Sequence, residues 1–191
     1  MNKLEGMYEL KKSYLPAVDW NLFQEATVLS DACSWTIRTA VFKGHDLHLP
    51  KLFGKNGQEA MAFGNKCLHE MKDKGIVFYY PYLTAEKSGV LQFDIHSIQL
   101  ECVDGDLSRL LDGSSPDASY YWEGTDLKEH GKKILSVKEK SELLEWVFYC
   151  RQRYRYIMSL EEKMQLEFSY VRDKDSEHQP SRLVFFEMRT I

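Results

Sequence analysis

Cysteine is sparse in this chain of 191 residues, and its four copies are spread widely along the sequence. No two of them form a Cys-x-x-Cys pair, which argues against a structural zinc site built from paired cysteines. We expect reduced and mostly buried thiols at these positions. The cysteines are Cys33, Cys67, Cys102 and Cys150.

Long apolar runs are also missing. The first twelve residues, MNKLEGMYELKK, contain no apolar core of signal-peptide length, and no later segment approaches the length of a membrane span. We therefore expect a cytoplasmic protein with no membrane partner.

Positive charge is not in excess, because 25 Lys and Arg stand against 29 Asp and Glu and the net charge is −4. Binding along a nucleic acid requires a dense basic face to neutralise phosphates. The one basic cluster, at Arg151, Arg153 and Arg155, is typical of a solvated helix face. We expect no nucleic-acid partner.

Apolar residues are plentiful, with 43% hydrophobic and 13% aromatic side chains. This content is enough for a packed core and excludes a disordered tail. The length fits one domain or two small lobes that share a core. No internal repeat or low-complexity segment is present.

The spacing of apolar residues predicts an α+β fold of mostly antiparallel strands with helices packed on them. Helices are predicted over four segments: 18–31, 57–75, 106–113 and 136–163. Strands are predicted over seven segments: 34–42, 76–83, 88–95, 97–105, 118–124, 164–171 and 182–191.

Helix ends and faces follow from a few residues. Asp19 is a candidate N-cap of the first helix, and Gly75 is expected to end the second. Ser136 and Glu139 form a capping-box pattern at the start of the longest helix. The face of that helix expected to meet the core carries Leu143, Val147, Cys150 and Tyr154.

Residues 43–57 are predicted to form a loop rich in glycine and histidine. His45 and His48 lie three apart in it, which leaves a metal pair or an ordinary surface loop as interpretations. The surface loop is favoured, because no acid completes the pair at helical spacing.

The last two predicted strands each carry one acid within an apolar pattern, Glu167 in MQLEFSYV and Glu187 in RLVFFEMRTI. Two neighbouring strands with inward acids can hold a divalent cation between them. Mg²⁺ is usually bound by one or two carboxylates plus phosphate oxygens, and Arg189 adds a charge suited to phosphate. The alternative is a hairpin whose acids face solvent.

Over roughly residues 34–191, six segments resemble, in order, motifs of the ATP-grasp domain of the phosphoenolpyruvate synthase and pyruvate phosphate dikinase family. The individual motifs are short, but their order is kept. The segments are IRTAV (37–41), HDLHLPKLFGKNGQE (45–59), IVFYYPYLTAEKSGVLQFD (76–94), IQLECVDGDLSRLLDGSSPDASYYWE (98–123), QLEFSYV (165–171) and FFEMR (185–189).

The resemblance implies that ATP is bound between two lobes, with Mg²⁺ as its metal. Arg38 would contact the terminal phosphates, since a planar guanidinium binds phosphate oxygens in pairs. Glu167 and Glu187 would bind Mg²⁺, and Arg189 would neutralise charge that develops during transfer. The alternative for Arg38 is pairing to a structural acid.

The same resemblance assigns the adenine to backbone groups of Tyr80, Tyr82 and Leu83, where Pro81 would free a carbonyl from strand pairing. Glu101 is a weaker candidate for the ribose or a second metal. The alternative for the tyrosines is packing in the core or at its rim.

The chain departs from the family pattern in three places. Only about three dozen residues precede Arg38, so we expect an abbreviated N-terminal lobe over 1–75 and an ATP-grasp-like lobe over 76–191. Gln165 stands where the family has Asp, and Glu187 stands where it has Gln. The phosphohistidine and pyruvate-binding domains of the family have no counterpart.

The resemblance therefore implies a stand-alone Mg·ATP-binding protein that acts as a phosphotransferase or ligase on a separate acceptor. The alternative is a degenerate nucleotide-binding or scaffold module that works with a partner protein. A third interpretation is a similarity of fold alone, in which the sheet binds a peptide or another chain.

Overall fold

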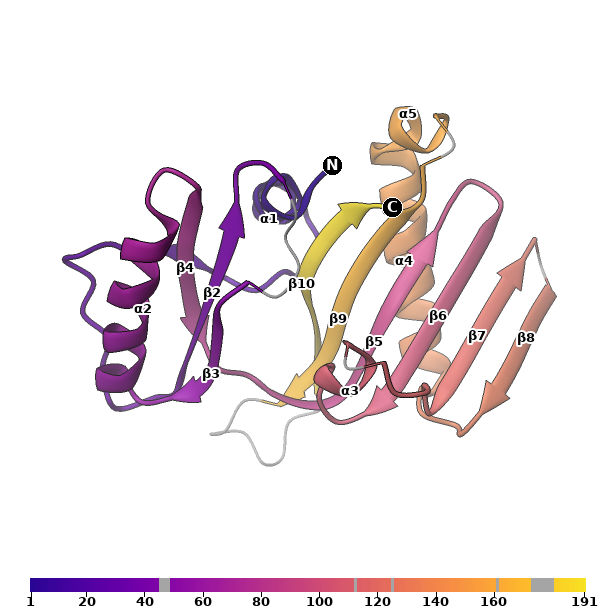
Figure 1. Ribbon diagram of the computed structural model, residues 1–191. Coiled ribbons are helices and arrows are strands. Elements are labelled where there is room, and N and C mark those ends of the chain that lie inside the picture. Colours follow the sequence, from indigo (N-terminus) through magenta and orange to yellow (C-terminus); the bar gives the residue numbers. More distant parts are fainter. Residues whose placement is uncertain (45–48, 112, 125, 161, 173–180) are drawn as a thin grey trace. The chain divides into compact units, whose positions relative to one another are not determined.

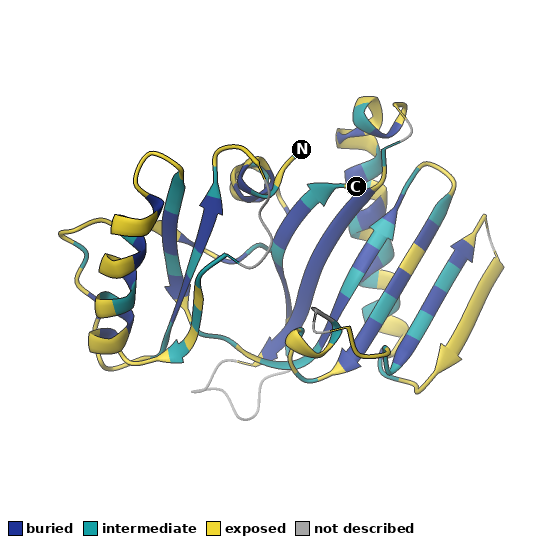
Figure 2. Ribbon diagram, in the orientation of Figure 1, coloured by how far each residue is buried: buried dark blue, intermediate teal, exposed yellow. Residues whose placement is uncertain are grey.

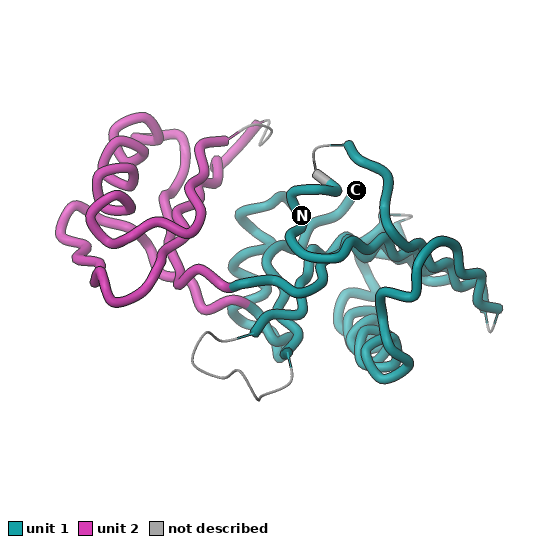
Figure 3. The backbone as a smooth tube through the Cα atoms, turned by 90° about the horizontal axis from the view of Figure 1, so that it is seen from below, with its two compact units in different colours: residues 1–17, 84–191 teal, residues 18–83 magenta. Residues whose placement is uncertain are grey.

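The computed structural model describes residues 1–191 except 45–48, 112, 125, 161 and 173–180 (Figure 1). The chain separates into two compact units (Figure 3). We call residues 18–83 the small unit, and residues 1–17 together with 84–191 the large unit. His45, His48 and the turn after β9 lie outside the described residues.

The small unit is a four-stranded antiparallel sheet with one helix packed on a face of it. The strand order is β1-β4-β2-β3. Its elements are β1 (Asn21–Leu22), β2 (Trp35–Val41), β3 (Lys51–Lys55), α2 (Gly57–Met71) and β4 (Gly75–Pro81). Ile37 and Val77 of the sheet form a core with Ala60 and Cys67 of α2.

Helix α2 begins and ends for local reasons. The Asn56 side chain caps it by accepting a hydrogen bond from the Glu59 amide at 2.8 Å. The helix ends at Met71, and Gly75 opens β4 instead of ending α2. A Cβ on Gly75 would lie 2.1 Å from the Ala40 carbonyl oxygen, so this pairing of β4 with β2 requires glycine.

The helix predicted over 18–31 is wrong. Asn21–Leu22 forms strand β1 beside β4, and the Phe23 amide donates to the Val77 carbonyl at 2.9 Å. Phe23 and Leu29 are buried, although their segment is not helical. Packing against the sheet therefore overrides the helical spacing. Strand β3 was also missed, because it lies within the predicted loop.

The large unit is a six-stranded antiparallel sheet in the order β10-β9-β5-β6-β7-β8. Its strands are β5 (Thr84–Phe93), β6 (Ser97–Asp104), β7 (Ala118–Glu123), β8 (Asp126–Gly131), β9 (Met164–Arg172) and β10 (Arg182–Thr190). Its helices are α1 (Lys3–Lys12), α3 (Ser108–Leu111), α4 (Val137–Arg153) and α5 (Arg155–Met158). Strand β9 is buried at every position but its last, and β8 is exposed throughout (Figure 2).

Helix α4 covers one face of this sheet (Figure 1). The Ser136–Glu139 capping box is present, and the predicted stripe is buried in the core. Val147 and Cys150 are fully buried there. Burial raises the pKa of the Cys150 thiol to about 12, so this thiol stays protonated. The helix ends at Arg153, earlier than expected.

Helix α1, which the sequence analysis missed, lies along β10, an edge strand of the sheet. Gly6 allows close approach, because a Cβ there would lie 1.6 Å from the Met188 carbonyl oxygen. Further along, the Phe185 amide donates to the Pro16 carbonyl at 2.8 Å. The N-terminal segment thus covers an edge that would otherwise be open to pairing with another chain.

The architecture confirms an α+β fold of antiparallel strands with packed helices. The boundary between the two lobes was predicted after residue 75. The structure divides after Leu83 instead, because β4 pairs with β2. Cys67, Cys102 and Cys150 are buried and Cys33 is exposed, as free thiols. None of the helices in the described parts of the chain is long and apolar enough to cross a membrane.

Candidate functional site

Glu167 and Glu187 lie directly opposite each other on the neighbouring strands β9 and β10. Both are buried, with 4% and 2% of their surface exposed. Residues opposite each other on antiparallel strands project from the same face of the sheet. The predicted pair of inward acids on adjacent strands is therefore present, and the solvent-facing alternative is wrong.

A β-bulge in β10 creates this juxtaposition. The register shifts between Phe185, which faces Phe168, and Glu187, which faces Glu167, so Phe186 is the extra residue. Before the bulge, Phe185 shares the apolar face covered by α4. Strict alternation would place Glu187 on that same face, and the bulge moves it to the opposite one.

The face opposite α4 carries three acids in one row that spans four strands, with a valine at the third position. Glu187 faces Glu167, Glu167 faces Val90 of β5, and Val90 faces Glu101 of β6. Glu101 is half-buried, and its Oε1 accepts a hydrogen bond from Gln99 at 3.4 Å. We call the face that carries Glu101, Glu167 and Glu187 the acidic face.

A second row of polar side chains lies on the same face, two residues away along each strand. Arg189 of β10 faces Gln165 of β9, which faces Gln92 of β5. With its carbonyl oxygen turned toward Arg189, the Gln165 amide accepts hydrogen bonds from Nη2 at 2.9 Å and Nε at 3.1 Å. Arg189 Nε also lies 3.8 Å from Glu187 Oε1. The guanidinium is thus held beside the paired acids.

Lys3, which the sequence analysis did not single out, contacts the same pair. Its Nζ lies 3.0 Å from Glu187 Oε2, and the two side chains are 14% and 3% exposed. The sequence carries one signal for the helix that places it: Asn2 and Glu5 form a capping box at the start of α1. Nothing in the sequence indicates that this helix packs on β10.

The remaining predicted residues belong to the small unit. Arg38 is half-buried on β2, opposite Phe78 of β4 and Lys51 of β3. Thr36 faces Tyr80, so by strand alternation Arg38 and Tyr80 project from the same face of the sheet. Their assignment to a nucleotide stays a prediction.

The segment predicted to hold adenine follows at the end of β4. Tyr80 is buried, whereas Tyr82 and Leu83 are half-buried. The Tyr82 amide donates to the Ser34 carbonyl at 2.8 Å, and its ring packs on Gly54. Since that amide is already bonded, a base at this segment would need other backbone groups, among them the Pro81 carbonyl.

Glu167 and Glu187 alone do not make a complete metal site. Within the described ranges, no group of three or more His, Cys, Asp or Glu side chains is arranged to hold a metal ion. Two carboxylates are nevertheless the usual protein contribution to Mg²⁺ when phosphate oxygens and water complete its shell. Glu167 and Glu187 therefore fit a metal that arrives with a phosphate ligand.

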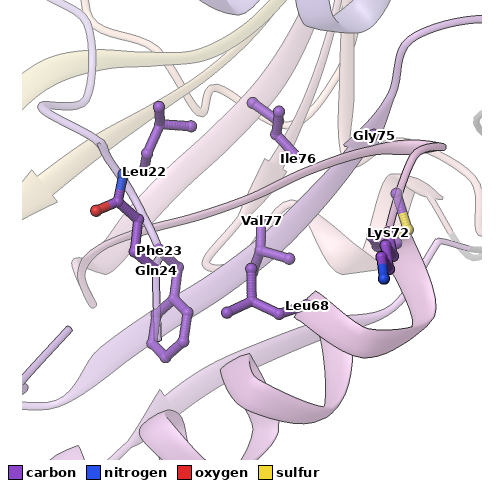
Figure 4. A pocket seen from close by; sticks show the side chains of 9 residues that line it. Leu22, Phe23, Gln24, Leu68, Lys72, Gly75, Ile76 and Val77 are labelled. Atoms are coloured by element: carbon purple, nitrogen blue, oxygen red, sulfur yellow. The ribbon is translucent and has the colours of Figure 1, made fainter. Parts of the chain in front are cut away.

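None of the predicted site residues lines either of two pockets formed by the described residues. One, of about 250 Å³, is in the small unit between β1, α2 and β4 and is mostly apolar (Figure 4). The other, of about 460 Å³, is in the large unit beside the first turn of α4. Lys87 and Lys140 line this second pocket, but both are already paired, with Glu139 and Glu129.

Comparisons with known proteins give little further information. No family model and no curated protein matches the chain. Among solved structures, the chain is similar to the crystal structure of the macrocyclase MdnC bound with precursor peptide MdnA from Microcystis aeruginosa MRC. The TM-score is 0.46 and the sequence identity 12%, over 98% of this chain and 51% of that one. This chain therefore spans about half the length of that structure, and a likeness at this level supports no conclusion about family, ligand or activity.

Proposed function

We propose that the chain is an ATP-grasp-like protein that binds Mg·ATP on the acidic face of the large unit. The observation that carries the proposal is the direct opposition of Glu167 and Glu187, both buried, with Arg189 beside them. Two buried like charges placed opposite each other destabilise a sheet unless cations compensate them. Lys3 and Arg189 supply such compensation to Glu187, and a divalent cation held by both acids would supply it to the pair.

Each side chain of the site would have its own role in binding Mg·ATP. Glu167 and Glu187 would hold Mg²⁺ together with phosphate oxygens. Bound Mg²⁺ would supply positive charge that stabilises the phosphates during transfer. Arg189 would donate hydrogen bonds to phosphate oxygens, and Gln165 would keep its guanidinium oriented. The reaction proposed is phosphoryl transfer or ligation to a separate acceptor.

Calorimetric titration with ATP, in Mg²⁺ and in EDTA, tests binding. We expect Mg²⁺-dependent binding that weakens at least about tenfold in Glu167→Gln and in Glu187→Gln, because each loses a charged metal ligand. Glu145→Gln is the matched control, since Glu145 is exposed on α4. Wild-type protein that shows no Mg²⁺-dependent binding at millimolar ATP would refute the proposal.

The roles of Arg38 and of the Tyr80–Leu83 backbone stay predictions. Arg38→Met in the same titration tests the first. An assay of ATP turnover with candidate acceptors then separates an enzyme from a nucleotide-binding module. Turnover that Glu167→Ala abolishes without loss of fold would support the enzyme, and binding without turnover would support the module that works with a partner.

A further inference from the structure

Lys3 holds one oxygen of the acid pair from the opposite end of the chain. Its Nζ lies 3.0 Å from Glu187 Oε2, and only 14% of its side chain is exposed. A surface lysine is usually a hydrated and mobile charge. Lys3 is instead largely withdrawn from water and paired with a carboxylate that is itself buried.

The fold fixes the position of this ammonium. Lys3 is the first residue of α1, directly after the Asn2 cap. Gly6 packs against the Met188 carbonyl of β10, and the Thr190 amide donates to the Met1 carbonyl at 3.0 Å. The start of the helix is therefore held against the strand that carries Glu187 at two points.

This arrangement places a cation where a metal would have to bind. Arg189 Nε lies 3.8 Å from Glu187 Oε1, and Lys3 contacts Oε2 of the same carboxylate. A divalent cation arriving alone would face the repulsion of Lys3 at short range in a partly desolvated site. A metal bound to a triphosphate brings an excess of negative charge, and its phosphate oxygens offer the ammonium a new partner.

We infer that Lys3 is a specificity-determining residue, which keeps free divalent cations off Glu187 and admits metal only together with a polyphosphate. This inference rests on the proposed function of the acidic face. Lys3 leaves Glu187 when the metal–nucleotide complex binds, and its ammonium then contacts phosphate oxygens. The site thereby responds to the metal–nucleotide complex rather than to the metal concentration.

The test measures Mn²⁺ binding without nucleotide, by loss of the free Mn²⁺ electron paramagnetic resonance signal. We expect weak binding to the wild type and about tenfold or tighter binding to Lys3→Met. Lys12→Met is the matched control on the same helix, because Lys12 is exposed, and it should behave as wild type. The gain should vanish in the double variant Lys3→Met/Glu187→Gln.

Equal Mn²⁺ affinity of the wild type and a folded Lys3→Met would overturn the inference, as would a gain that survives Glu187→Gln. Should circular dichroism show that Lys3→Met does not fold, Lys3→Gln keeps a polar side chain and serves in its place. The proposed function fails separately, through the absence of Mg·ATP binding to the wild type. The two failures are distinguishable because the Mn²⁺ titration contains no nucleotide.

Discussion

Gly6 lies where helix α1 packs on the backbone of β10, and its replacement by alanine gives a test with a definite sign. In an exposed helix, Gly→Ala stabilises by about 1 kcal/mol. Here the new Cβ would lie 1.6 Å from the Met188 carbonyl oxygen, whereas ordinary contact begins at 3.4 Å. The strand cannot yield without breaking its pairing with β9, so α1 has to move by roughly 2 Å.

That displacement acts on two side chains that α1 buries. Met7 and Leu10 are 1% and 2% exposed, and full burial of such a side chain contributes about 1.5–3 kcal/mol. Losing part of the contacts of both costs about 3 kcal/mol, and the helix-propensity gain offsets about 1 kcal/mol. We therefore expect Gly6→Ala to lower the free energy of unfolding by about 2 kcal/mol.

Urea unfolding followed by far-ultraviolet circular dichroism measures this change. The midpoint should fall while the denaturant dependence stays constant. Lys12→Ala, at an exposed position of the same helix, should change the free energy of unfolding by no more than about 0.5 kcal/mol. A Gly6→Ala protein as stable as the wild type, or more stable, would refute the packing of α1 on β10.

Three further substitutions test the large unit by the same measurement. Leu143→Ala on the buried face of α4 should lower the free energy of unfolding by about 2–5 kcal/mol. Val137→Ala, at a position 80% exposed, should be nearly neutral. Equal effects of the two substitutions would contradict the orientation of the helix. Ser136→Ala removes the side-chain cap of α4 and should cost about 1 kcal/mol, so no loss would argue against the capping box. The hydrogen bond from Lys132 lowers the pKa of Asp117 from its usual 3.8 to about 2. The stability that this carboxylate contributes is therefore complete above about pH 4 and is lost as the pH falls toward 2. Asp117→Asn should accordingly be less stable than wild type at neutral pH, with a difference that shrinks below pH 4; a difference independent of pH would exclude this linkage.

Local patterns were enough for most of the regular elements. The capping box at Ser136 and the stripe through Val147 predict α4 because both depend on residues within a few turns of each other. The same reasoning predicted a helix wrongly for the segment around Trp20 and Phe23, because the apolar residues of this segment pack on β4 without forming a helix. Spacing alone does not distinguish these two uses.

In the candidate site, too, local patterns identified some residues, whereas a contact between distant parts of the chain could not be predicted. Its acids could be named from the sequence because Glu167 and Glu187 interrupt apolar strand patterns near the end of the chain. That the two strands are neighbours followed from their closeness in sequence and was confirmed. Lys3 could not be found, because its contact with Glu187 joins residues 184 positions apart in the chain.

The sequence by itself determined which residues could carry the chemistry: two acids on consecutive strands and an arginine two residues beyond the second. The tertiary structure decided which way they face. Alternation along β10 would place Glu187 on the side of Phe185, toward α4, and the bulge at Phe186 places it opposite Glu167 instead. The physical reason is that strand alternation is a local property, whereas the position of a bulge depends on the register with the neighbouring strand.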